Sequence, residues 1–175
     1  SSWHYGEREI KLVDTAGLRR KAKVTEKVEG LSGSDSIRSI KYAQVVVLVL
    51  DSNAILEKQD LTLARQVVEE GRALLIAVNK WDVADDRNAS VQRLNDRLET
   101  SLPQIRGVPV VTCSSKTGKG LEKLMPAVFK LHEQWNRRIS TARLNNWLAA
   151  TTETHPPPLV AGRRIRLRYI TQAKA

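Results

Sequence analysis

Short aliphatic runs that alternate with helix-length amphipathic segments are the feature that most constrains the fold of this 175-residue chain. The runs cover residues 45–50, 73–78 and 108–113, and a fourth segment, residues 9–13, reads as a strand that leads into a polar motif. Runs that are apolar at every position are typical of strands buried on both faces of a parallel sheet. The segments between them place apolar residues at helical spacing. The alternation predicts an α/β fold, in which a mostly parallel sheet carries helices on both faces.

Polar and glycine residues follow three of these strands, at the edge where parallel sheets bind ligands. The three motifs are Asp14-Thr15-Ala16-Gly17, Asn79-Lys80-Trp81-Asp82 and Ser114-Ser115-Lys116. Taken alone, the first motif is better explained by a strand-to-loop turn, the second is explained about equally well by chance in a polar loop, and the third indicates nothing. Their order and their helix-sized separations together predict a guanine-nucleotide site.

The second motif carries the base recognition in this interpretation. The Asp82 carboxylate can accept hydrogen bonds from N1 and the 2-amino group of guanine, which adenine cannot offer, and sites of this kind discriminate strongly. Asn79 is expected to brace the loop and approach the base edge. The aliphatic stem and charge of Lys80 are expected to cover one face of the ring.

The other two motifs are expected to meet the phosphates, the metal and the base carbonyl. Asp14 can hold Mg²⁺ through water, since Mg²⁺ dehydrates reluctantly and binds few carboxylates. Gly17 lets its backbone N–H approach a terminal phosphate. Backbone donors of residues 114–116 are expected to reach the guanine carbonyl oxygen, with Lys116 beside the ring.

The motifs, taken with several further segments, resemble the second GTPase domain and the start of the KH-like domain of the EngA (Der) family of ribosome-assembly GTPases. The further segments are Leu18-Arg19-Arg20-Lys21, Trp135-Asn136-Arg137-Arg138, Arg143 to Trp147, His155-Pro156-Pro157-Pro158 and Gly162-Arg163-Arg164-Ile165. The resemblance implies a P-loop-GTPase-like domain over residues 1–138 and the start of an α+β KH-like domain over residues 139–175. It also implies a protein that binds GTP and GDP with Mg²⁺, hydrolyses GTP, and acts on the large ribosomal subunit and its rRNA. The single cysteine, Cys113, favours a reduced, cytoplasmic setting, and a monomer is expected.

Two departures from the family pattern limit what this chain is expected to do. No Gly-x-x-x-x-Gly-Lys-Ser/Thr segment occurs in the 175 residues, and we expect this phosphate-binding loop upstream of Ser1. Leu18 stands where many GTPases carry a glutamine that orients the attacking water, which an apolar side chain cannot do. We therefore name no catalytic residue, expect a monovalent cation or the ribosomal partner to position water, and expect this chain alone to be inactive.

Basic charge is concentrated at the C-terminal end. From Arg137 onward the net charge is +7, against +3 for residues 1–136. A helix is expected after Ser140, which can cap it, and a strand over residues 163–170, where basic and apolar residues alternate. Its cationic face, Arg164, Arg166 and Arg168, is expected to contact RNA; an edge strand protected by charge is the structural alternative.

The functional alternative is a non-catalytic RNA- or ribosome-binding module in which the nucleotide is structural. Trp81, Trp135 and Trp147 are expected to pack in cores or at the seam between domains. No apolar run approaches the roughly 20 residues of a membrane-spanning helix, so no membrane contact is expected.

Overall fold

The computed structural model describes residues 1–13, 39–54, 56–102, 107–160 and 162–173, which fall into two compact units. Unit 1 is Ser1–Trp135 and unit 2 is Asn136–Ala175, and each is considered by itself. The first expected motif, residues 14–18, lies outside the described residues.

Strands and helices alternate along unit 1 and give way to one helix and a short hairpin in unit 2. The elements are β1 Ser2–Tyr5, β2 Arg8–Lys11, β3 Val45–Asp51, α3 Lys58–Glu69, β4 Ala73–Asn79, the 3₁₀ turn η1 Trp81–Val83, α4 Arg87–Ser101, β5 Val110–Thr112, the 3₁₀ turn η2 Leu121–Lys123, α5 Leu124–Trp135, α6 Thr141–Thr154, β6 Leu159–Val160 and β7 Arg163–Arg164. Among the described residues, no helix combines the length and the apolar character needed to cross a membrane.

The core of unit 1 is a parallel sheet in the order β3-β4-β5. The β3–β4 register runs from the Val45 and Ala73 pair to the Asp51 and Asn79 pair. All six residues of the aliphatic run in β4 are buried. A central parallel strand covered on both faces has no polar side to present, which explains the unbroken apolar run. The three strands predicted for this part of the chain are confirmed.

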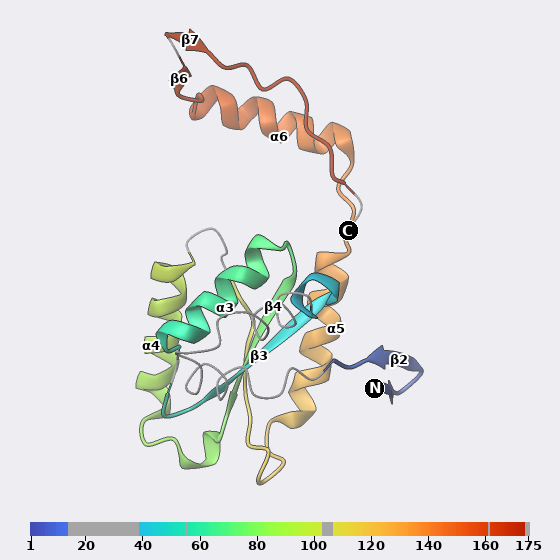
Figure 1. The fold of residues 1–175 in the computed structure, drawn as a ribbon, viewed down its shortest axis with the longest axis vertical. Coiled ribbons are helices and arrows are strands. Elements are labelled where there is room, and N and C mark those ends of the chain that lie inside the picture. Colours follow the sequence, from blue (N-terminus) through green and yellow to red (C-terminus); the bar gives the residue numbers. More distant parts are fainter. Residues whose placement is uncertain (14–38, 55, 103–106, 161, 174–175) are drawn as a thin grey trace, which may run out of the picture. The chain divides into compact units, whose positions relative to one another are not determined.

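Opposite faces of β4 are covered by different helices (Figure 1). Leu74, Ile76 and Val78 belong to a cluster with buried residues of α3 and α4. Leu75 and Ala77 belong to a second cluster with residues of α5. Each fully buried Leu or Ile contributes about 1.5–3 kcal/mol relative to an exposed one. The predicted α/β fold with helices on both faces of the sheet is confirmed.

The last residue of α5 is fastened to the turn that precedes β4. The Trp135 indole Nε1–H donates to the Gly71 carbonyl at 2.7 Å, and the Arg72 guanidinium lies 6.0 Å from the centre of the Trp135 ring. Trp135 is half-buried, as the sequence predicts for a packed tryptophan.

The strand expected over residues 9–13 is wrong as a member of the parallel sheet. Instead, β2 pairs antiparallel with β1, from Ser2 opposite Lys11 to Tyr5 opposite Arg8. The turn between them contains Gly6 at φ +59°, a conformation that glycine adopts without strain. The hairpin rests on α5, where the Arg8 guanidinium lies 4.6 Å from the centre of the Phe129 ring.

Unit 2 is built on α6. The Ser140 side chain accepts a hydrogen bond from the Arg143 N–H, which confirms the predicted cap. The helix ends at His155, immediately before three prolines that cannot continue it. The Asn145 side chain bonds both backbone groups of Ile170, donating to its carbonyl at 2.9 Å and accepting from its N–H at 3.1 Å.

The strand expected over residues 163–170 is largely wrong. Only β7 is a strand, and it pairs with the two residues of β6. The side chains predicted to form a buried face remain exposed, Ile165 at 43%, Leu167 at 54% and Tyr169 at 68%. Trp147 is also exposed, at 58%, rather than packed in the core of its unit. One helix and a two-residue ladder supply too little apolar surface to cover a second layer.

Gly120 makes a close approach that a side chain would prevent. Its φ is +83°, and an added Cβ would lie 2.3 Å from the Thr112 carbonyl oxygen in β5. We predict that Gly120→Ala lowers the free energy of unfolding of unit 1 by about 3 kcal/mol, the sum of a left-handed backbone and an overlap.

Gly118→Ala is the matched control in the same loop. Gly118 has a φ of +78°, but an added Cβ would meet nothing within 4 Å. Its cost should therefore be only the backbone term of about 1–2 kcal/mol. Urea unfolding of both variants measures the difference, and equal costs would contradict the proposed overlap with Thr112.

Candidate functional site

The second and third motifs meet at the carboxyl ends of β4 and β5. These strands pair in parallel, and two backbone bonds extend the pairing beyond β5. The Cys113 N–H donates to the Val78 carbonyl at 2.8 Å, and the Trp81 N–H donates to the Cys113 carbonyl at 3.0 Å. The two loops therefore form one continuous edge.

Asn79 and Ser115 join the two loops directly. The Ser115 N–H donates to Asn79 Oδ1 at 2.9 Å, and Asn79 Nδ2 donates to Ser115 Oγ at 2.9 Å. The structure thus shows a bracing contact of the kind that the sequence predicts for Asn79. The approach of Asn79 to a base edge stays a prediction.

The loop after β5 is closed by its own backbone. The Ser114 N–H donates to the Lys119 carbonyl at 2.9 Å, and the Gly118 N–H donates to the Ser114 carbonyl at 2.8 Å. Because the Ser115 N–H is engaged by Asn79, the N–H of Lys116 is the motif's one backbone donor without a hydrogen bond in the described part of the chain. The expected donation to a guanine carbonyl stays a prediction, and the Lys116 N–H is the donor of the motif that remains available for it.

Asp82 is held as a carboxylate in η1. The Ser114 hydroxyl lowers the pKa of the Asp82 carboxyl, and partial burial opposes this effect; the Asp82 N–H, Lys116 and Arg87 lower the pKa further. Asp82 Oδ1 is covered from solvent and makes no hydrogen bond to any described residue. A covered carboxylate oxygen without a donor is costly, which marks η1 as a place of unmet bonding.

Two hollows lie near this edge. One, of about 260 Å³, contacts both motifs and is lined by Trp81, Asp82, Arg87, Thr112, Ser114, Thr117, Lys119, Gly120, Glu122 and Lys123. The other, of about 490 Å³, is an open depression at the start of α4, lined by residues 84–88. The smaller one is chemically relevant because Asp82 and Ser114, from the two motifs, both line it.

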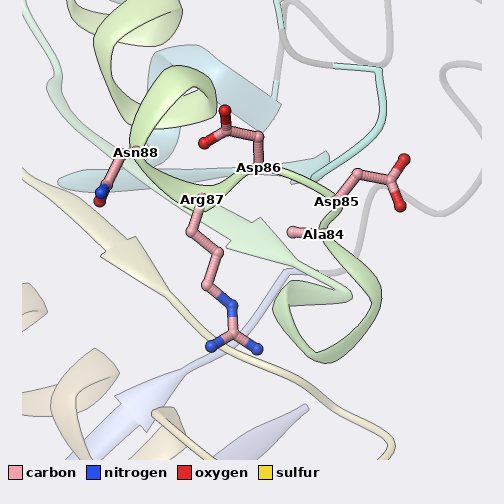
Figure 2. Close-up of a pocket in the computed structure, with 5 residues that line it drawn as sticks. All are labelled: Ala84, Asp85, Asp86, Arg87 and Asn88. Carbon is pink, nitrogen blue, oxygen red and sulfur yellow. The ribbon is translucent and has the colours of Figure 1, made fainter.

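The wider depression has a structural explanation. Asp86 caps α4, its side chain accepting from the Ala89 N–H at 2.9 Å. Figure 2 shows the Asp85 and Asp86 carboxylates directed away from the Arg87 guanidinium, so no group there converges on a common point.

Lys80 has an unusual backbone. Its φ of +59° and ψ of 32° are left-handed, which costs a residue with a side chain about 1–2 kcal/mol. Its Nζ lies 2.7 Å from Asp51 Oδ2, at the end of the neighbouring strand β3. The Ser52 hydroxyl donates to the Lys80 carbonyl at 2.9 Å.

Asp51 and Ser52 are residues that the motif analysis missed. They belong to no motif, and the one signal was position, since Asp51 closes the aliphatic run of β3 at the same edge as Asn79. Trp81, within the second motif, is partly buried and packs against the α3–α4 side of the core, as expected.

The arginines expected to contact RNA are exposed. Arg164 lies in β7, whereas Arg166 and Arg168 follow it without regular structure. Within the described residues none of the three forms an ion pair with an acidic group. They are thus available to an anionic partner, although not as one face of a single strand.

Comparisons with known protein families divide the chain near the end of α5. Residues 2–134 match the family described as the elongation factor Tu GTP binding domain. Residues 138–175 match the KH-domain-like C-terminal domain of EngA bacterial GTPase enzymes.

Curated relatives match nearly the whole chain. It is 54% identical over 165 residues to a protein named GTPase Der from Dinoroseobacter shibae, covering 94% of this chain and 34% of that protein. It is 53% identical over 173 residues to GTPase Der from Agrobacterium fabrum, covering 99% of this chain and 36% of that protein. The chain thus spans about a third of the length of these relatives.

Solved structures show the same fold. The G-domain of FeoB from Methanococcus jannaschii matches with a TM-score of 0.52 and 25% identity, over 75% of this chain and 78% of that one. The resemblance to EngA drawn from the sequence motifs is confirmed. The chain belongs to the elongation factor Tu GTP-binding domain family, and a KH-like segment of the EngA type follows that domain.

Proposed function

We propose that the protein carrying this chain binds GTP and GDP and hydrolyses GTP as a molecular switch. The observation that carries the proposal is the Asp82 carboxylate, whose pKa is lowered and which lines a hollow together with Ser114 of the third motif. Ionised Asp82 can accept from N1–H and the 2-amino group of guanine, whereas adenine presents an acceptor at N1. The relatives named GTPase Der and the family match support the same conclusion.

The proposal for the phosphate-binding side of the site is based on the sequence alone. Asp14, Thr15, Ala16, Gly17 and Leu18 lie outside the described residues, and Mg²⁺ held by Asp14 is part of the proposal. When bound, Mg²⁺ would neutralise charge on the phosphate oxygens. Leu18 cannot orient water, so a monovalent cation or a ribosomal partner is proposed to do so.

The biological setting is proposed from unit 2. We assign residues 139–175 to the KH-like domain and propose that this cytoplasmic monomer acts in assembly of the large ribosomal subunit. Arg164, Arg166 and Arg168 are exposed and form no ion pair with the part of the chain that the structure describes, which supports contact with rRNA. They equally support the second candidate, a non-catalytic RNA-binding module.

Stimulation of phosphate release by ribosomal subunits would favour the switch, and identical ribosome binding with GTP, GDP or no nucleotide would favour the module.

Asp82→Asn should change the base preference of the full-length protein from guanine to xanthine. An amide can donate to the xanthine 2-carbonyl, which a carboxylate repels. GTP affinity should fall roughly 100-fold or more, since the site loses its acceptor for the 2-amino group. Competition between GTP and XTP measures the change, with exposed Asp96→Asn as the control. Retained preference for guanine would remove Asp82 from base recognition.

Replacing Arg164, Arg166 and Arg168 together by Gln should weaken ribosome or rRNA binding by the full-length protein. The slope of log affinity against log salt should become shallower by roughly 0.7–0.9 per lost phosphate contact. Exposed Arg65, Arg93 and Lys130 on unit 1, also changed to Gln, form a charge-matched control. An unchanged salt slope in the first variant would show that its arginines are solvated.

The 175-residue chain should bind GTP much more weakly than the full-length protein. It contains Asp82 and Lys116 but no Gly-x-x-x-x-Gly-Lys-Ser/Thr segment to surround the phosphates with N–H groups and a lysine. Titration of both proteins with a fluorescent GTP analogue tests this expectation. Equal affinities would contradict the view that phosphate binding depends on that loop.

A further inference from the structure

Lys80 is restrained at both ends by the residues that terminate β3. Ser52, only 3% exposed, donates its hydroxyl to the Lys80 carbonyl at 2.9 Å, while its own N–H donates to the Asn79 carbonyl at 3.0 Å. Asp51 Oδ2 lies 2.7 Å from Lys80 Nζ. The lysine backbone and its ammonium group therefore have separate partners on the same neighbouring strand.

The carboxylate that holds the ammonium group is itself fixed. Asp51 Oδ1 accepts a hydrogen bond from the Asn53 N–H at 3.0 Å. The strand register places Asp51 directly beside Asn79, the residue before Lys80. With both carboxylate oxygens engaged, Asp51 is a rigid acceptor rather than a mobile surface charge.

An unrestrained lysine would be a poor cover for a flat ring. Its side chain has many rotamers, and ordering it during binding reduces affinity. Its left-handed backbone is also unfavourable unless surrounding contacts hold it. The contacts with Asp51 and Ser52 meet both requirements before any ligand arrives.

We propose that Asp51 and Ser52 are positioning residues for the base side of the nucleotide site, acting through Lys80. Ser52 holds the left-handed backbone, and Asp51 holds the ammonium group so that the aliphatic stem is extended for contact with one face of the guanine ring. This inference rests on the proposed nucleotide-binding function and assigns a role to two residues outside its motifs.

The direction in which Asp51→Asn changes nucleotide affinity distinguishes a positioning role from a simple effect of charge. Asp51→Asn removes a negative charge near an anionic ligand, so electrostatics alone would tighten nucleotide binding. Loss of positioning weakens it instead. The amide keeps an oxygen for the Asn53 N–H, so the variant leaves the turn after β3 intact.

The experiment measures GDP affinity of the full-length protein by calorimetry. Asp51→Asn and Ser52→Ala should each weaken GDP binding roughly three- to tenfold, the range expected when one long side chain loses its order. Affinity for inorganic pyrophosphate, which has no base, should not fall. Exposed Asp85→Asn, the same substitution on a carboxylate directed away from its neighbour Arg87 in Figure 2, should not weaken GDP binding.

A double-mutant cycle tests whether the effect passes through the lysine. In a Lys80→Ala background, Asp51→Asn should cause no further weakening of GDP binding, because no lysine remains to be positioned. Unchanged or tighter GDP binding by Asp51→Asn, or full additivity with Lys80→Ala, would overturn the inference. If the wild-type protein does not prefer guanine nucleotides, the proposed function fails instead, so the two failures are distinguishable.

Discussion

The parallel pairing of β4 with β3 on one side and β5 on the other is the constraint on which the rest of unit 1 depends. The pairing sets which residues share an edge, because parallel strands in register end together. Asp51, Asn79 and Cys113 are brought side by side in this way, although they are far apart in sequence. Burial on both faces stabilises the arrangement, since a slip of one residue would exchange the α5 face of β4 for the α3–α4 face.

The edge that this pairing creates carries three departures from local rules among the described residues of unit 1. Lys80 has a left-handed backbone, Asp82 has a covered oxygen without a donor, and Gly120 passes so close to β5 that it leaves no room for a Cβ. Proteins depart from local rules mainly where function requires it. These departures share one sheet edge, whereas the aliphatic interior of β4 follows every rule for a buried strand.

The patterns of apolar residues predicted the elements that are held by burial in the core. They failed for segments whose structure depends on which strand is available to pair with them. The runs at residues 45–50 and 73–78 form the strands that they predict, although only the run in β4 is buried throughout, and the spacing around Ala64 and Val67 forms the predicted helix. Residues 9–13 look equally strand-like, but Gly6 offers a turn, so β2 pairs with β1. The alternation of basic and apolar residues over 163–170 produces a strand only if another strand is available to pair with it. Here the Asn145 side-chain amide bonds the backbone N–H and carbonyl of Ile170 instead. Motifs likewise predicted that Asn79 and Ser115 lie at the same edge, while Asp51 and Ser52 required the register to be known.

The bond between the Trp135 indole and the Gly71 carbonyl has a mechanical consequence. Any pull along the chain from Asn136 enters unit 1 at Trp135 and passes to the turn before β4, at the end of that strand opposite Asn79. A strand of this length spans about 20 Å, and all of its interior is close-packed. Load therefore reaches the edge around Asp82 by two routes, through β4 and through the backbone of α5, which begins directly after Glu122 and Lys123 in the wall of the smaller hollow.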